Sequence, residues 1–136
     1  MKVVVDTNVF ISGVFFTGPP NQILKAWRDG RLDLAVSAEI LEEYQRVSMI
    51  LSEKYPEINV ARILDLMTVE AKVVSAPPLP EPVCQDQDDD KFLACALAAK
   101  AKIVISGDKH LLDVSGYRAI EINRPREFLD RYLAET

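Results

Sequence analysis

Apolar residues are distributed in two ways along this chain. In some stretches they form short unbroken runs rich in valine and isoleucine, and in others they recur every three or four residues. The first pattern is typical of buried strands, and the second is typical of helices with one buried face. The strands predicted in this way are residues 2–5, 32–36, 73–74, 103–105 and 119–122.

The helical stretches begin and end at residues that commonly terminate helices. Asn21, Ser37 and Asn59 are predicted N-caps, Gly30 ends the first of these helices, and Gly18-Pro19-Pro20 before it is predicted to be a loop. The periodicity predicts helices over residues 21–29, 37–51, 59–71 and 88–100, and a last helix that begins at Pro125.

Prolines are concentrated in one short segment, residues 77–82, where neither a helix nor a central strand can form. We interpret this segment as an extended connection. A domain boundary is the alternative, but the part of the chain after it is short for an independent core. We therefore expect one domain over residues 1–136.

The alternation of strands and helices predicts a fold class. Strands separated by helices are typical of a parallel, doubly wound sheet. We expect an α/β domain of three layers, α/β/α, with a central parallel sheet of about five strands.

Composition and charge limit the function classes. The 136 residues carry a net charge of −5, which argues against binding nucleic acid by bulk positive charge alone. Divalent cations in an acidic site would reverse the local potential, so nucleic-acid chemistry stays open. We find no secretory signal and no membrane-spanning run, and two cysteines do not make a disulfide framework, so a cytoplasmic location is expected.

Acidic residues gather where predicted strands end or predicted helices begin. Asp6 directly follows residues 3–5, Asp108 follows residues 103–105 after Ser106 and Gly107, and a third group comprises Asp86, Asp88, Asp89 and Asp90. Ligand sites of open α/β sheets form at the carboxyl ends of the strands. Clustered carboxylates repel each other unless a cation or shared protons compensate them, and oxygen ligands of this kind suit Mg²⁺ or Mn²⁺.

Helical spacing separates the inward acids from the outward ones. Glu43 lies beside the apolar stripe of its helix and is expected to point inward. Asp89 shares the inward stripe of the helix that it starts, whereas Asp88 and Asp90 are expected to face solvent. His110, the only histidine, is interpreted as a surface or capping residue rather than a base.

Several of these residues also have a purely structural interpretation. Asp6 is placed where it would cap a helix after the first strand, and some of the aspartates favour a helix N-terminus through their charge alone. Thr7 and Asn8 are short hydrogen-bonding residues that would orient the carboxylate or a metal-bound water, and Ser106 can hydrogen-bond a carboxylate or a phosphate.

Four sequence strings together resemble the PIN domain, and most closely its VapC-like toxins of toxin–antitoxin pairs. They are Val-Val-Asp-Thr-Asn-Val, the segment 37–44, the aspartate-rich run before an alanine-rich helix, and Ser-Gly-Asp in place of the usual Thr-Gly-Asp. The resemblance assigns the metal-binding and catalytic acids to Asp6, Glu43, Asp89 and Asp108, with Asp86 as an auxiliary ligand. It implies a Mg²⁺- or Mn²⁺-dependent ribonuclease, a homodimer and a small antitoxin partner.

The resulting hypothesis is metal-assisted hydrolysis of RNA phosphodiester bonds, with RNA contacted by Lys91, Lys109 and Arg46. One alternative is a non-catalytic module that binds RNA or protein. Another is phosphoryl transfer through an aspartyl phosphate on Asp6, although Asn8 stands where that chemistry expects a second aspartate. A homodimer is also favoured by an apolar segment made up of Tyr44, Ile50, Leu51 and Tyr55.

Overall fold

The computed structural model describes residues 1–133 and contains one five-stranded sheet. All neighbouring strands are parallel, in the order β3-β2-β1-β4-β5. The strands are β1 (Lys2–Val5), β2 (Asp33–Ser37), β3 (Lys72–Val74), β4 (Ile103–Ile105) and β5 (Glu121–Asn123). The predicted fold class, a parallel α/β sheet of about five strands, is confirmed.

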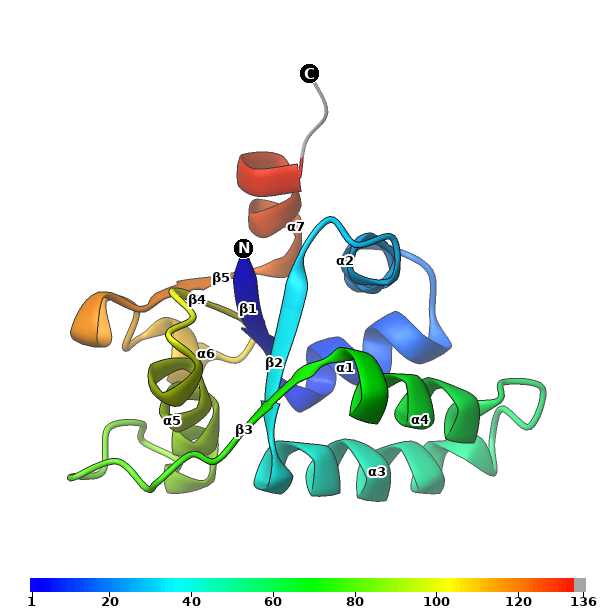
Figure 1. The fold of residues 1–136 in the computed structure, drawn as a ribbon, viewed down its shortest axis with the longest axis horizontal. Helices are drawn as coiled ribbons and strands as arrows, with labels where there is room; N and C mark the ends of the chain where they lie inside the picture. Colours follow the sequence, from blue (N-terminus) through cyan, green and yellow to red (C-terminus); the bar gives the residue numbers. More distant parts are fainter. Residues whose placement is uncertain (134–136) are drawn as a thin grey trace.

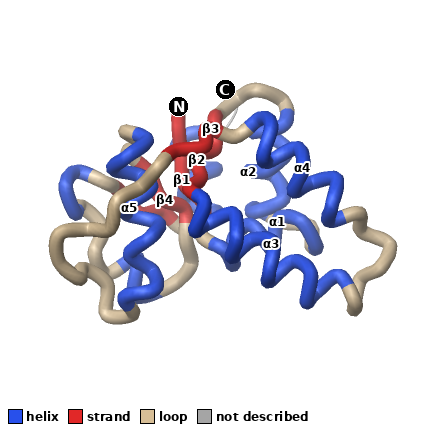
Figure 2. Tube along the Cα trace, turned by 60° about the horizontal axis from the view of Figure 1, so that its bottom comes forward, coloured by secondary structure: helices blue, strands red, loops and turns tan. Residues whose placement is uncertain are grey.

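Helices cover both faces of this sheet. Figures 1 and 2 show α1 to α4 on one side of the strands and α5 on the other. The α-helices are α1 (Thr7–Phe15), α2 (Pro19–Arg28), α3 (Ala38–Ser52), α4 (Val60–Glu70), α5 (Asp90–Ala99), α6 (Lys109–Leu112) and α7 (Pro125–Phe128). Shorter helical turns are Gln87–Asp89, Tyr117–Ala119 and Leu129–Leu133.

The order of the strands brings distant parts of the sequence together at one edge. β1 lies in the middle of the sheet, and Val5 is paired in register with Ile105, which is paired with Asn123. These three strands therefore end level with one another. The backbone N–H of Asp6 continues the pairing and donates to the carbonyl of Ile105 at 3.0 Å. Residues that follow β1 and β4 consequently meet, although about 100 residues separate them in the sequence.

The core beneath this edge is apolar and anchored by one tyrosine. Tyr44 is completely buried, stacks on Phe10 with ring centroids 4.1 Å apart, and donates its hydroxyl to the carbonyl of Val5. This contact joins α3 to the end of β1, one residue before Asp6. The stacking and the hydrogen bond fix α3 against the sheet at the residue next to Glu43.

The start of the chain differs from the sequence predictions in two ways. No helix range was assigned between Asp6 and Gly18, but α1 occupies Thr7–Phe15, with Asp6 as the cap that the structural interpretation placed there. Pro19 and Pro20 are not a loop but the first residues of α2, where a proline loses no helical hydrogen bond. Asn21 therefore does not cap this helix, and its side-chain amide donates to the carbonyl of Gly13 at 2.9 Å.

The other boundaries agree with the sequence predictions to within a few residues. Ser37 and Asn59 cap α3 and α4 as predicted, and residues 75–86 connect β3 to the next helical turn without a helix or strand. The last strand begins at Glu121 instead of Ala119, because Ala119 has a left-handed backbone (φ 65°) within a turn. Among the described residues, no helix is long and apolar enough to cross a membrane.

The apolar segment proposed for dimerisation is mostly part of the core. Tyr44 is fully buried, and Leu51 and Tyr55 pack against the core as partly buried side chains. Ile50 is different, since 66% of it is exposed, and its neighbour Met49 is also exposed. The core therefore accounts for three of the four apolar side chains, and the homodimer stays a prediction.

Candidate metal centre

Asp6 ends β1 and performs two structural tasks at once. Its Oδ1 accepts a hydrogen bond from the backbone N–H of Val9 at 2.8 Å, which caps α1, and its Oδ2 accepts from the hydroxyl of Ser106. The residue is only 4% exposed. Burial, together with the charges of Asp108 and Glu43, raises the pKa of Asp6 to about 6 against the lowering effect of these hydrogen bonds. The side chain that caps α1 is thus also a buried acid with a raised pKa.

Asp108 reaches the same edge from the end of β4. The hydroxyl of Ser106 accepts a hydrogen bond from the backbone N–H of Asp108 at 2.9 Å, so Ser106 joins Asp6 to Asp108. Asp108 in turn accepts from the backbone N–H of His110 at 2.8 Å and caps α6. Gly107, which links Ser106 to Asp108, has a φ outside the left-handed region.

Asp89 approaches from the other face, at the start of α5. Its side chain is 16% exposed, and its Oδ2 is enclosed by protein without a hydrogen-bond donor among the described residues. Burial and the charges of Asp108, Asp86 and Asp6 together raise the pKa of Asp89 to about 6, against a lowering effect of His110. The predicted inward orientation of Asp89 is confirmed, and its unpaired oxygen is the most costly feature of the site.

The other acids of this run have separate positions. Asp88 is 72% exposed, as predicted, and Asp86 is exposed and accepts a hydrogen bond from the backbone N–H of Asp88 at 3.0 Å. Asp90 was predicted to face solvent, which is wrong. Its carboxylate accepts from the backbone N–H groups of Val83 at 3.0 Å and Cys84 at 2.7 Å. Asp90 therefore fastens the proline-rich connection to α5.

Glu43 points inward from α3, as predicted, but both of its oxygens are occupied. Thr7 donates its hydroxyl to Oε1, and the ammonium of Lys91 lies 2.6 Å from Oε2. Lys91 also lies 3.1 Å from Asp88, and burial, which lowers the pKa of Lys91, is outweighed by these two carboxylates, so its pKa is raised. Glu43 is thus compensated by Lys91, whereas no lysine or arginine of the described residues lies within ion-pair distance of the enclosed oxygen of Asp89.

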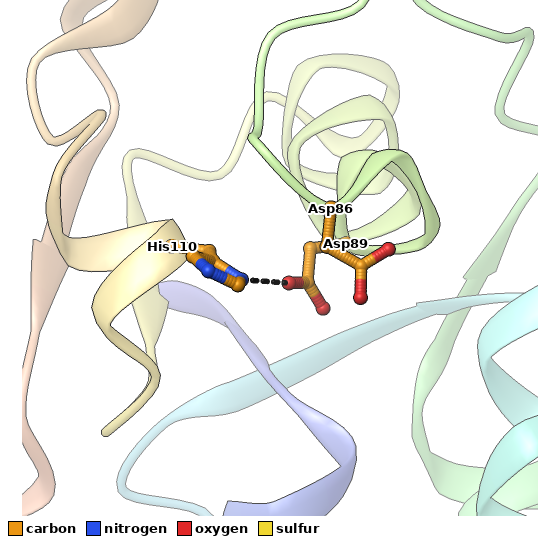
Figure 3. Close-up of side chains that lie close together, drawn as sticks. All are labelled: Asp86, Asp89 and His110. Carbon is orange, nitrogen blue, oxygen red and sulfur yellow. Dashed lines mark ion pairs between the residues drawn. The ribbon is translucent and has the colours of Figure 1, made fainter.

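His110 lies in the acidic group, which the sequence did not predict. Figure 3 shows its ring pointing from α6 toward Asp89 and Asp86. Its Nδ1 is 3.9 Å from Asp89 Oδ2 and 3.8 Å from Asp108 Oδ1. The sequence feature that could have predicted this position is that His110 is only two residues after Asp108. This spacing places the imidazole beside the end of β4 once α6 has formed.

The remaining predicted residues lie farther out. Asn8 is on the exposed side of α1, and Lys109 is exposed on α6. Arg46 is largely exposed, with its guanidinium 3.9 Å from Glu43. Lys109 and Arg46 therefore lie at the rim of the site, while Lys91 lies within it.

The donor set fits a divalent cation. One enclosed carboxylate oxygen of Asp89 has no donor, and both Asp6 and Asp89 are held with raised pKa values by burial and by neighbouring charges. Ligand atoms of Asp86, Asp89 and His110 all lie within 4.8 Å of one another. A bound cation would relieve each of these costs, because it favours the charged carboxylate and pairs the free oxygen.

Comparison with known proteins gives two matches. The sequence model of the PIN domain matches residues 2–110, which include every acid described above. An uncharacterized protein of Methanocaldococcus jannaschii, MJ1680, is 34% identical to this chain over 145 aligned positions. The alignment covers 97% of this chain and 92% of MJ1680, so the two proteins correspond over nearly their whole lengths.

Proposed function

This chain belongs to the PIN-domain family, and from this premise we propose that it is a metal-dependent endoribonuclease. PIN domains are generally nucleases, and the acidic cluster described above is a possible metal site. The observation that carries the proposal is the enclosed, unpaired oxygen of Asp89 among Asp6, Asp86 and Asp108. Such an arrangement is expensive in a protein without a cation and is typical of acids kept for a metal.

In the proposed site, each acidic residue has a distinct role. Asp89 holds the cation through its free oxygen, and Asp6, Asp108 and Asp86 are further ligands, directly or through water. A Mg²⁺ or Mn²⁺ ion there supplies a bound water of lowered pKa and neutralises charge on the phosphate. Ser106 orients Asp6 through its hydrogen bond, and Glu43 acts through Lys91 or a water because both of its oxygens are engaged.

RNA is the proposed substrate, and three cations are its proposed contacts. Lys109 and Arg46 are exposed at the rim, and Lys91 lies between the acids and a neighbouring pocket of about 340 Å³. Apolar side chains on the proline-rich connection and on α5 line part of this pocket, including Pro78, Leu79 and Ala94. A strand whose phosphate contacts Lys91 would have room for an adjoining nucleotide there.

The toxin role is the finer part of the proposal, and it rests on the resemblance of the four sequence strings to VapC-like toxins. A toxin of this kind acts with a small antitoxin encoded beside it. A neighbouring reading frame for a short DNA-binding protein that binds this chain and blocks cleavage would support the role. A chain that cleaves RNA but has no such neighbour would be a ribonuclease of another kind.

A homodimer is also part of the proposal. The exposed apolar side chains of Met49 and Ile50 on α3 are its remaining local support. We expect light scattering at micromolar concentration to give twice the monomer mass of 15.2 kDa, and Ile50→Glu to shift the protein to the monomer. A wild-type protein that scatters only as a monomer would exclude the dimer.

The aspartyl-phosphate alternative has less structural support. A nucleophilic carboxylate must reach the phosphate, but Asp6 is buried and each of its oxygens already accepts a hydrogen bond. A non-catalytic module would have no need for the enclosed free oxygen of Asp89, which costs stability without a ligand.

The proposed activity is tested by cleavage of labelled RNA. Purified protein should cut structured or single-stranded RNA at internal positions with Mn²⁺ or Mg²⁺ and stop when EDTA is added. The rate should fall as salt is raised, because RNA held by a few lysines and arginines releases counterions on binding. Cleavage that continues in EDTA would contradict a metal-dependent mechanism.

A further inference from the structure

We propose that His110 is a nitrogen ligand of the metal centre, and that the centre therefore favours a first-row transition-metal ion such as Mn²⁺ over Mg²⁺. This inference rests on the proposed metal site and adds the class of cation that it takes. It also changes the interpretation of the only histidine in the chain, which the sequence placed at the surface.

The separations around His110 fit ligands of one ion better than they fit hydrogen bonds. Nδ1 lies 3.9 Å from Asp89 Oδ2 and 3.8 Å from Asp108 Oδ1, both too long for a hydrogen bond. Two ligands of one cation lie at most about 4.2 Å apart, since each metal–ligand bond is ~2.1 Å. Both separations from Nδ1 are thus within the range that a shared cation allows.

The free oxygen of Asp89 supplies an independent observation. Asp89 Oδ2 is the oxygen that faces Nδ1, and it is also the enclosed oxygen without a hydrogen-bond donor (Figure 3). A direct hydrogen bond to the imidazole would satisfy both groups but is not formed. The gap between them is therefore accounted for by an ion that takes one lone pair from each.

The backbone delivers the imidazole to this place. Asp108 caps α6 by accepting from the N–H of His110 at 2.8 Å, and Leu111, the next residue, is completely buried. The cap and the buried leucine set the direction of α6, and the ring of His110 extends from it toward Asp89 and Asp86 (Figure 3).

A nitrogen ligand changes the choice of cation. Mg²⁺ takes oxygen ligands and keeps several of its waters, whereas imidazole binds transition-metal ions more strongly. A set made only of Asp6, Asp86, Asp89 and Asp108 would suit Mg²⁺ and Mn²⁺ alike. With His110 as an additional ligand, the affinity for the transition-metal ion should rise relative to the affinity for Mg²⁺.

The test uses the untagged protein and Mn²⁺ or Mg²⁺ alone, without RNA. Pulsed electron paramagnetic resonance of bound Mn²⁺ should show coupling to an imidazole ¹⁴N, which should change to ¹⁵N coupling when the protein is grown with ¹⁵N-histidine. Because the chain has one histidine, this signal identifies His110. Wild-type protein that binds Mn²⁺ without any nitrogen coupling would overturn the inference.

Titration of three variants completes the test. His110→Gln should lose about tenfold in Mn²⁺ affinity and change Mg²⁺ affinity by less than about threefold, since partners around a metal typically contribute ~10–100-fold. The exposed control Lys109→Gln should change the ratio of the two affinities by much less. An unchanged ratio in His110→Gln overturns the inference. Asp89→Asn should weaken both ions, and if it binds both like the wild type, the proposed metal site itself fails.

Discussion

Asp89→Asn should lose most of the stabilisation that Mn²⁺ gives the wild-type protein, while the metal-free variant melts at or above the wild-type temperature at pH 7. A ligand that binds only the folded state stabilises it by about 2.7 kcal/mol at a hundred times its dissociation constant. Asp89 offers an enclosed carboxylate oxygen with no hydrogen-bond donor among the described residues, so the amide removes a charge and a ligand without removing a hydrogen bond at that oxygen. Melting curves in EDTA and in Mn²⁺ measure both effects.

The stability of the metal-free protein should fall as the pH rises from about 4 to about 6, which agrees with a destabilising effect of the charged acids. The folded-state pKa values of Asp6 and Asp89 are both raised from 3.8 to about 6, so between pH 4 and 6 the folded protein holds more protons than the unfolded chain. Stability from these two groups is therefore present below about pH 4 and is lost as the pH rises through 6. Asp89→Asn removes one of them, and its stability should fall less over this interval.

The matched control is Asp88→Asn, one residue away. It makes the same change of charge on a side chain that is 72% exposed, so its melting temperature in Mn²⁺ should follow that of the wild type. RNA cleavage by Asp89→Asn should fall by about 100-fold or more, and cleavage by Asp88→Asn by far less. If both variants respond to Mn²⁺ like the wild type, Asp89 is not a ligand.

Lys91→Met should destabilise the metal-free protein by about 1–2 kcal/mol and increase the stabilisation that Mn²⁺ gives. Lys91 and Glu43 are 17% and 14% exposed, and removal of the lysine leaves the Glu43 carboxylate beside other acids without its cation. A fully buried pair would cost ~3–5 kcal/mol, but some solvent contact remains here. A bound metal would then supply the missing positive charge, so the cation should bind Lys91→Met more tightly.

A double-mutant cycle separates this pair from other effects of the substitution. Lys91→Met with Glu43→Gln should recover most of the lost stability, because neither charge is then left unpaired. Lys109→Met, an exposed lysine on α6, is the control for loss of positive charge. Urea unfolding of the wild type, the two single variants and the double variant measures the coupling between Lys91 and Glu43. If the effects of Lys91→Met and Glu43→Gln on the free energy of unfolding are additive, the ion pair between Lys91 and Glu43 does not contribute to stability.

Strand ends were the part of the site that the sequence could predict. Asp6 and Asp108 follow short valine and isoleucine runs, and parallel strands place their carboxyl ends at one edge. The inward orientation of Glu43 and Asp89 also followed from spacing, because a helix must bury one face. The roles that the family resemblance assigns to these four acids stay a proposal.

Local sequence misled where a residue had a partner far along the chain. Asp90 was expected in solvent, but its carboxylate holds the backbone of Val83 and Cys84. Pro19 and Pro20 are typical of a loop, yet proline is equally suited to the first turn of a helix, and α2 begins there. In each case the residue type allowed two structures, and packing selected one.

The sequence by itself therefore determined the order of the elements, the parallel sheet and the acids at its edge, since hydrophobic periodicity is set by local geometry. Only the tertiary structure decided which charges compensate one another. It paired Glu43 with Lys91, left one oxygen of Asp89 unpaired, and brought His110 to that oxygen. These contacts depend on how α3, α5 and α6 pack around the ends of β1 and β4. The periodicity within a single helix or strand does not predict this packing.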